Sequence, residues 1–395
     1  MKKTLAVFFG GCSCEHDVSI ITGHQVMENA DRSQYDVFPI YIDRSGRWYT
    51  GESLRDIKAF EAFSPDTAQQ IYMNPFPDDG AVYKVNEKRR LFSGKRKPIA
   101  HIHVALPAMH GMNGEDGTLQ GFLELADIPY TSAGVMGSSL GMDKIAMHMI
   151  FRGAGLPVLP FIACERIRFT QEPDAVLKEA EEKLLYPIFV KPCNLGSSIG
   201  ISRATDRESL RNALEVAFSY DRRVMMEKGL ECIEVNCSAM GFGGSPEVSL
   251  VEQPVSHKEL LSFGEKYLGK LSKASGMANL SRILPAQIGN EMTDEVRRLT
   301  GEIFTLLDCR GVVRIDYMIE KSTNQLYVNE INTIPGSLAY YLWEPLGISF
   351  TRLIDRIVDQ AVAAQREKHA NNYVYESPIL AQFTSGLKNM KRGKT

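Results

Sequence analysis

Residues 311–336 read GVVRIDYMIEKSTNQLYVNEINTIPG. Apolar and polar residues alternate over 312–319 and again over 326–332, and the polar sequence KSTNQ separates the two runs. Two alternating runs joined by a short polar segment are typical of a β-hairpin. We therefore predict two antiparallel strands here, with the loop at 321–325.

The polar side chains of this hairpin are predicted to share one face. Because side chains alternate along a strand, a loop at 321–325 places Asp316 opposite Glu330 and Arg314 opposite Asn332. Two facing carboxylates repel each other unless a cation lies between them. Carboxylate and amide oxygens are ligands that Mg²⁺ accepts together with nucleotide phosphates. The hairpin therefore indicates a magnesium site or, as the plainer alternative, a solvated strand face.

The overall composition excludes several classes of protein. A chain of 395 residues is long enough for two or three domains, and 44% hydrophobic with 24% charged residues describes a globular protein. A net charge of −3 gives no general attraction to nucleic acid or to an anionic membrane. No run of residues has the length of a membrane span or the pattern of a signal peptide. We expect a cytoplasmic protein that binds neither nucleic acid nor membranes.

The cysteines give no sign of a disulfide framework or a zinc site. They are seven, an odd number, and scattered, which favours a reducing compartment. Cys12, Cys14 and His16 lie close together, but no second pair of ligands with zinc-like spacing follows them.

The N-terminal third has the pattern of an α/β layer. The apolar run TLAVFF at 4–9 ends at two glycines, and a helical pattern follows. The glycines allow backbone N–H groups to approach an anion, but the spacing of a known phosphate loop is missing. From 44 to 98 the periodicity is weak, and we predict an irregular, partly helical insertion with a hairpin formed by AVYKV and RRLF.

Three later segments have features of a nucleotide site. A helix predicted over 138–155 has Lys144 near its start, and a predicted strand ends at Lys191. The glycine- and serine-rich loop at 193–204 can fold over a triphosphate with backbone donors, or it can be a plain hairpin turn. The polar segment at 256–284 is long enough to be a lid.

Seven motifs of the chain, in this order, resemble the D-alanine–D-alanine ligase family of ATP-grasp enzymes. They are GGCSCEHDVSI, HGMNGEDGTLQGFLE, GMDK, FVKPCNLGSSIG, MEKGLECIEVN, EKYLGK and GVVRIDYMI…VNEINTIPG. Each motif is weak alone, whereas seven in the family's order are specific. They cover about 1–115 and 135–360, apart from 44–98. The residues by themselves support only an α/β protein with a magnesium–nucleotide site.

The resemblance implies α/β and α+β architecture, an ATP-grasp fold with an N-terminal doubly wound α/β domain. The domains that it implies are 1–135 with the insertion at 44–98, a central small domain at 136–235, a C-terminal domain at 236–370, and a tail at 371–395. It also implies a homodimer. The cofactors that it implies are ATP and two Mg²⁺ ions, for which Mn²⁺ is expected to substitute.

The resemblance also implies a role for each matching residue. ATP phosphorylates the carboxylate of a first D-alanine, and the amine of a second D-amino acid then attacks the acyl phosphate. The residues expected to bind ATP are Lys144, Lys191, Ser198, Glu227, Lys228, Glu234 and Lys266. The expected metal ligands are Asp316, Glu330 and Asn332. The expected catalytic residues are Glu15, Ser197, Tyr267 and Arg314, and those expected to bind the substrates are Glu15, His110, Gly336, Tyr341 and Leu342.

The second substrate is the least determined part of the prediction. Family members commonly carry a serine where this chain has Tyr341, so D-alanine, D-serine and other small D-amino acids remain candidates. Tyr267 speaks against D-lactate. Two alternatives of other kinds are another ATP-grasp carboxylate–amine ligase and a non-catalytic nucleotide-binding protein. The complete set of candidate phosphate-binding and metal-binding residues argues against the second of these.

Overall fold

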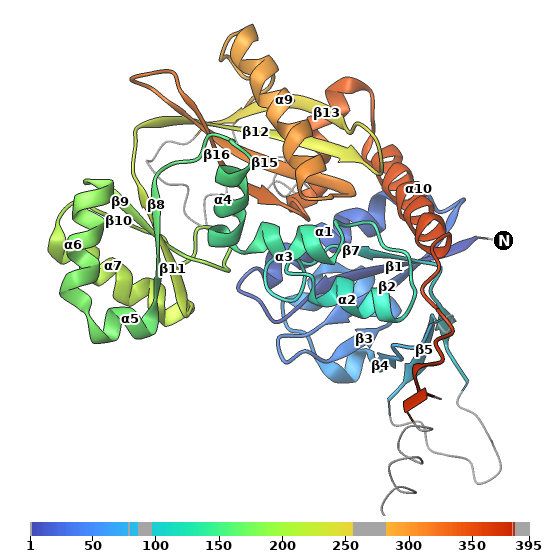
Figure 1. The fold of residues 1–395 in the computed structure, drawn as a ribbon. Helices are drawn as coiled ribbons and strands as arrows, with labels where there is room; N and C mark the ends of the chain where they lie inside the picture. Colours follow the sequence, from blue (N-terminus) through green and yellow to red (C-terminus); the bar gives the residue numbers. More distant parts are fainter. Residues whose placement is uncertain (1, 78–79, 86–96, 256–281, 381, 384–395) are drawn as a thin grey trace, which may run out of the picture.

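The computed structural model of the 395-residue chain describes residues 2–77, 80–85, 97–255, 282–380 and 382–383. Within these ranges the strands form three sheets, with seven, four and five strands. In Figure 1 the first sheet lies at the lower right, the second at the left and the third at the top. The mixed α/β and α+β architecture predicted from the sequence is confirmed.

The seven-stranded sheet is built from the N-terminal part of the chain. Its strand order is β6-β5-β4-β3-β2-β1-β7, with β1 parallel to both β2 and β7. Leu5, Val7 and Phe9 pack on one face against α1 and α10, whereas Ala6 and Phe8 pack on the other face against α2. This alternation is why a helical layer covers each face. The strands are β1 (Lys3–Gly10), β2 (Tyr35–Ile42), β3 (Trp48–Thr50), β4 (Gln69–Met73), β5 (Ala81–Lys84), β6 (Ala100–His101) and β7 (Val104–Pro107), and the helices are α1 (His16–Asn29), α2 (Thr118–Leu125) and α10 (Phe350–His369).

The prediction of an irregular insertion at 44–98 was partly wrong. Three short 3₁₀ helices are present (Glu52–Arg55, Ile57–Phe60 and Pro65–Thr67), but β3, β4 and β5 continue the N-terminal sheet. β5 pairs with β4 and β6, whereas RRLF lies outside the described residues. Strands of three to five residues show too little alternation to be recognised, and their pairing depends on a sheet edge supplied by other parts of the chain.

The four-stranded sheet and its helices form the unit at the left of Figure 1. Its order is β10-β9-β11-β8, and all three pairings are antiparallel. Helices α6 and α7 bury Leu177 and Leu214 against it. The elements are β8 (Phe161–Glu165), α5 (Arg166–Gln171), α6 (Pro173–Leu184), β9 (Ile188–Pro192), β10 (Ser202–Ala204), α7 (Arg207–Tyr220) and β11 (Arg223–Lys228).

The five-stranded antiparallel sheet contains the hairpin of the opening stretch. Its order is β14-β13-β12-β15-β16, and α9 packs on it. Met240, Val312 and Trp343 join one continuous core with β1, α1 and α10, so the first and third sheets are packed together. The elements are β12 (Cys232–Gly241), β13 (Glu247–Pro254), β14 (Arg282–Ile283), α9 (Asn290–Leu306), β15 (Gly311–Glu320), β16 (Leu326–Asn332), η5 (Gly336–Leu342) and η6 (Glu344–Leu346).

The predicted hairpin is confirmed, but its ladder is not regular. Asp316 pairs with Glu330 and Arg314 with Asn332, as predicted. Nearer the loop the register differs by one residue, because Asn329 is an extra residue that forms a β-bulge. The regular ladder would have placed Leu326 and Val328 on the polar face; the bulge lets both join the core. The pairs on the loop side are Tyr317–Val328, Met318–Tyr327 and Ile319–Leu326.

The single helix predicted over 138–155 was also wrong, because the structure has two. Helix α3 (Val135–Met142) ends before Asp143, whose backbone is extended, and α4 (Lys144–Gly153) begins after it. The Asp143 carboxylate accepts the Ala146 N–H at 2.9 Å and caps α4. Aspartate is among the strongest N-cap residues, so it starts a new helix here. Lys144 is thereby the first residue of α4.

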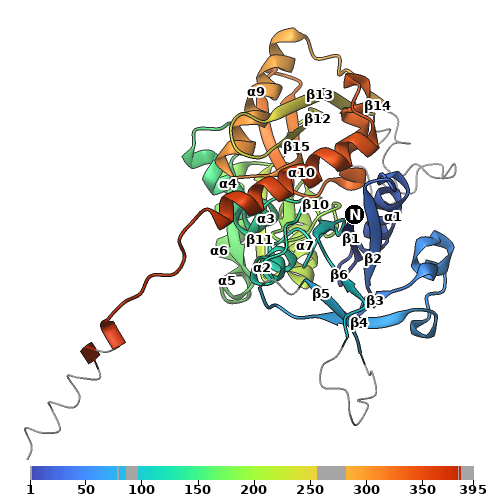
Figure 2. The ribbon, with the colours of Figure 1, turned by 90° about the vertical axis from the view of Figure 1, so that its right-hand side faces the viewer.

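The chain leaves the body of the protein after α10, as Figure 2 shows. Tyr373, Val374 and Tyr375 are exposed there. In the described ranges, every helix is too short or too polar to cross a membrane.

Candidate active site

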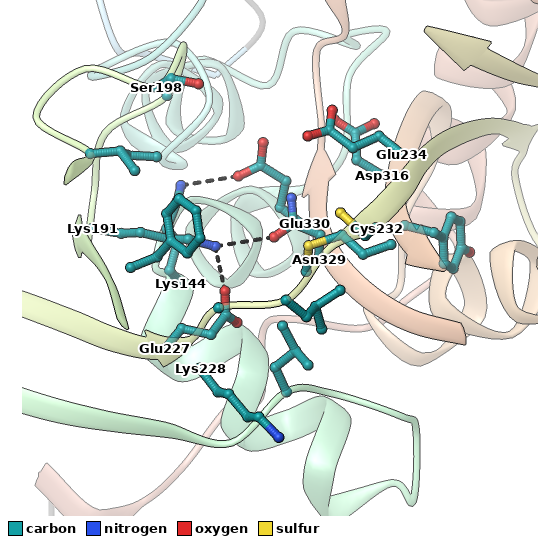
Figure 3. A pocket seen from close by; sticks show the side chains of 18 of the residues that line it. Lys144, Lys191, Ser198, Glu227, Lys228, Cys232, Glu234, Asp316, Asn329 and Glu330 are labelled. Carbon is teal, nitrogen blue, oxygen red and sulfur yellow. Dashed lines mark hydrogen bonds and ion pairs between the residues drawn. The ribbon is translucent and has the colours of Figure 1, made fainter. Parts of the chain in front are cut away.

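A cavity lies between the four-stranded and five-stranded sheets, and Figure 3 shows it from close by. Its walls come from α4, the loop after β9, and strands β9, β11, β12, β15 and β16. Six of the seven predicted ATP-binding residues line it, as do two of the three predicted metal ligands. These eight residues are Lys144, Lys191, Ser198, Glu227, Lys228, Glu234, Asp316 and Glu330. The seventh, Lys266, lies outside the described residues.

Two lysines enter this cavity from different elements, and acidic or carbonyl groups hold each of them. Lys144 Nζ donates to Leu195 O at 2.8 Å and lies 3.2 Å from Glu330 Oε2. Burial alone would lower the pKa of Lys144, but the Glu330 carboxylate outweighs it and raises the pKa. Lys191 Nζ donates to Glu227 Oε2 at 2.6 Å and to Asn329 Oδ1 at 3.2 Å. The ammonium group of Lys144 therefore stays charged inside the protein.

The predicted metal ligands lie at the end of the hairpin ladder. Asp316 accepts two hydrogen bonds of 2.7 Å from Arg314, and the Asn332 amide donates to Asp316 Oδ2 at 3.1 Å. In the part of the chain described, no group of three His, Cys, Asp or Glu side chains is placed to hold a metal. Two carboxylates and an amide on one face still fit Mg²⁺, which takes few protein ligands and completes its shell with phosphate and water. Arg314 and Lys144 are the cations beside these carboxylates.

Two loops converge on Glu15, in front of helix α1. The Ser197 hydroxyl donates to Glu15 Oε1, which joins the serine-rich loop to the N-terminal part of the chain. A Cβ atom on Gly111 would lie 2.7 Å from the Glu15 carboxylate, and one on Gly196 would lie 2.6 Å from it. A side chain at either position would therefore displace the Glu15 carboxylate from its present place. Of the predicted trio, Glu15 and Ser197 are thus brought together, whereas Tyr267 lies outside the described residues.

Glu115 belongs to this region and was missed by the sequence reasoning. Its carboxylate accepts the Gly111 N–H at 2.8 Å and the Ile334 N–H at 3.1 Å, so it joins the loop after β7 to the segment after β16. Burial, with the charge of Glu15 next, raises the pKa of Glu115 to about 8. The acid-rich sequence GEDG was the available signal, but it cannot show which acid turns inward.

His110 is buried beside the same segment. Its Nε2 lies 2.8 Å from Thr22 Oγ1, which also accepts the Ser337 N–H at 3.2 Å. Burial lowers the pKa of His110 to about 4, so the ring is neutral at neutral pH. Thr22 is a further residue that the sequence reasoning missed. It connects α1 both to His110 and to the turn that begins at Gly336.

The predicted second-substrate residues are buried in the structure. The Tyr341 hydroxyl donates to Glu252 Oε1 at 3.3 Å, and the Arg282 guanidinium stacks over its ring at 3.8 Å. Leu342 lies wholly inside the core, and Gly336 is buried. The sequence did not point to Glu252, which also pairs with Arg282 at 3.0 Å. The phenol at the family's serine position is therefore turned toward a buried carboxylate.

Comparison with known proteins agrees with this arrangement. The family described as D-ala D-ala ligase N-terminus matches residues 4–133, and the one described as D-ala D-ala ligase C-terminus matches 150–359. A D-alanine–D-alanine ligase of Caldicellulosiruptor bescii is 35% identical over 95% of this chain and 99% of its own. A D-alanine–D-alanine ligase of Chloroherpeton thalassium is 36% identical over 93% of this chain and 98% of its own.

Solved structures give the same result. The D-alanine–D-alanine ligase from Coxiella burnetii matches with a TM-score of 0.74 and 26% identity, over 93% of this chain and 96% of its own. The VanG D-Ala:D-Ser ligase from Enterococcus faecalis matches with a TM-score of 0.76 and 29% identity, over 91% and 100%. The architecture is that of the ATP-grasp fold. The chain belongs to the D-alanine–D-alanine ligase family.

Proposed function

We propose that the protein joins two D-alanine molecules to D-alanyl-D-alanine for peptidoglycan precursor synthesis, with ATP as the phosphoryl donor. One observation supports this most strongly: a single cavity brings together two buried lysines and the facing carboxylates of Asp316 and Glu330. Phosphoryl transfer needs cations around the phosphates and oxygen ligands for Mg²⁺, and this cavity offers both.

The nucleotide is assigned to this cavity. Lys144, Lys191 and Ser198 would contact the phosphates, and Glu227, Lys228 and Glu234 would lie along the adenosine. A lysine ammonium is a compact charge with three donors, which suits phosphates that move during transfer. Lys266 belongs to the same proposal by resemblance alone.

Two Mg²⁺ ions, replaceable by Mn²⁺, are assigned to Asp316, Glu330 and Asn332. Bound there, the ions would neutralise the charge that develops on the transferring phosphoryl group. Asn332 Nδ2 now donates to Asp316, so its amide would turn over to offer its oxygen to a metal. A half-turn about the Cβ–Cγ bond of Asn332 exchanges the positions of its amide nitrogen and oxygen.

The first D-alanine is assigned to the space in front of Glu15. The Glu15 carboxylate would hold the substrate ammonium, with neutral His110 beside it. Arg314 is buried and fixed by Asp316, so it is poised to stabilise negative charge on the acyl phosphate and on the tetrahedral intermediate. Tyr267 belongs to the same proposal, beside Glu15 and Ser197, by resemblance alone.

The second substrate is assigned to the segment Gly336, Tyr341 and Leu342. Because the Tyr341 hydroxyl is directed to Glu252, we propose that Tyr341 shapes the pocket with its ring and does not bind the substrate through its hydroxyl. D-alanine is the proposed second substrate. D-serine is the second candidate, since a structural relative is a D-Ala:D-Ser ligase and the tyrosine departs from the family's serine. We further propose the domain limits given above, a cytoplasmic location and a homodimer.

Phosphate release with Mg·ATP tests the proposal. We expect turnover with D-alanine alone and none with L-alanine. Release only when D-serine accompanies D-alanine would favour the second candidate. No release with any D-amino acid would refute the proposal and point to another carboxylate–amine ligase.

A further inference from the structure

The β-bulge residue Asn329 contacts one side chain that lines the nucleotide cavity, Lys191, and one that lies behind its wall, His148. A bulged residue is left unpaired in the ladder, so its backbone groups need other partners. The Asn329 carbonyl accepts from His148 Nε2 at 2.7 Å, and its side-chain Oδ1 accepts from Lys191 Nζ at 3.2 Å. One residue thus connects helix α4 to the lysine on β9.

His148 is wholly buried behind the wall of the cavity and does not line it. Its ring meets the Phe161 ring edge-on, with centroids 5.4 Å apart. Because a carbonyl can only accept, Nε2 must carry the ring hydrogen, and Nδ1 then presents a lone pair to Glu227 Oε1 at 3.6 Å. The direction of the ring is therefore fixed by the Asn329 peptide.

Lys191 is held by two of its three N–H groups. Glu227 accepts one hydrogen bond and compensates the charge, and Asn329 accepts a second one that orients the ammonium group. One of the three N–H donors then remains for the cavity. If the Asn329 peptide rotated, its side chain would swing away from Lys191. The Lys191 ammonium would keep its ion pair with Glu227, but without the Asn329 contact it would no longer be held in one direction.

We propose that His148 is a positioning residue for nucleotide binding: it fixes the Asn329 peptide, and Asn329 with Glu227 directs Lys191 toward the phosphates. The proposal rests on the nucleotide site of the preceding section. The competing view is that His148 is only a buried core residue whose loss would loosen the protein as a whole.

Two substitutions separate the two ring nitrogens. The amide of a glutamine comes close to the position of Nε2, so His148→Gln keeps a donor for the Asn329 carbonyl. The shorter asparagine places its amide near Nδ1, so His148→Asn faces Glu227 but cannot reach Asn329. Asn329→Ala is the second test, because it keeps the backbone carbonyl that His148 contacts and removes the side-chain amide, with the Oδ1 that accepts from Lys191. The matched control is His24, which is also buried but packs on Phe9 and Phe60, changed to Gln and to Asn.

The measurement is the Kd of Mg·ADP by calorimetry on the full chain, with thermal unfolding in parallel. We expect His148→Asn and Asn329→Ala to weaken binding about tenfold, His148→Gln to stay within about threefold of the wild type, and both His24 variants to leave binding unchanged. Equal losses in the two His148 variants, or normal binding by His148→Asn or Asn329→Ala, would overturn the proposal. Unfolding of both His148 variants leaves Asn329→Ala to decide.

The two proposals fail separately. A wild-type protein that binds Mg·ADP but releases no phosphate with D-amino acids would refute the ligase and leave the His148 test valid. A wild-type protein that binds no nucleotide would overturn the role of His148 as well.

Discussion

Replacing Lys191 by methionine should expose how strongly the buried ion pair of the cavity depends on its two partners. The Glu227 side chain is only 2% exposed and the Lys191 side chain 10%, with 2.6 Å between Nζ and Oε2. Removing one partner of such a pair leaves a buried charge without compensation, which costs about 3–5 kcal/mol. His148 Nδ1 lies 3.6 Å from the other carboxylate oxygen, and a protonated ring can replace part of the lost charge. We therefore expect Lys191→Met to lower the free energy of unfolding by about 3 kcal/mol, near the lower end of that range.

The double variant Lys191→Met with Glu227→Gln removes both charges and should recover most of that loss. Its free energy of unfolding should return to within about 1.5 kcal/mol of the wild type, because a pair removed together leaves no unpaired charge. Nucleotide binding should not return, since the ammonium is absent in both variants. Urea unfolding followed by circular dichroism measures the first quantity, and Mg·ADP calorimetry measures the second.

The two readouts separate stability from function at a single pair. A double variant no more stable than Lys191→Met alone would refute the reasoning, because Glu227 would then not depend on Lys191. Normal Mg·ADP binding by either variant would remove Lys191 from the nucleotide site. Glu227→Gln alone is the control for the loss of the carboxylate.

Three further outcomes follow from the same contacts. Glu330→Ala should abolish phosphate release but keep the circular dichroism spectrum, because the 25% exposed side chain is not part of the core; near-normal release would exclude the metal assignment. Glu115 in the folded protein keeps a proton up to about pH 8 that the unfolded chain releases from about pH 4.5, so wild-type stability should fall as pH rises through this window. Glu115→Gln should flatten that fall in pH-dependent unfolding, and an unchanged slope would contradict the shifted pKa. Tyr341→Phe should keep the KM of the second substrate within about threefold, since the hydroxyl donates to Glu252; a large rise would mean that it reaches the substrate.

Two features of the sequence predicted much of the fold around the site: the alternation of apolar and polar residues, and the order of the seven motifs. The hairpin was placed correctly because alternation reports directly which side chains share a face. The ATP-grasp architecture came from the order of seven motifs and not from periodicity. A break such as Asp143 was missed because a helical pattern continues through it, and only the capping side chain shows that a new helix begins.

The residues missed in the site have one property in common. Glu115, Thr22 and His148 each connect segments that are far apart in sequence, and the sequence around each residue does not show which distant segment it contacts. Local pattern gives the face of a strand or helix on which a residue lies. Local pattern cannot show which distant residue a side chain contacts, because that contact depends on how the sheets pack together.

The bulge at Asn329 is the exception, because its signal was present in the sequence. The apolar residues of β16 are Leu326, Val328 and Ile331, so their spacing changes from two to three. A regular strand that buries the first two would turn Glu330 into the core, because side chains alternate. The extra residue restores Glu330 to the face of Asp316 and leaves the Asn329 side chain to meet Lys191. A one-residue irregularity thus allows a strand with buried apolar side chains to offer a carboxylate to the proposed metal site and an amide to the lysine beside it.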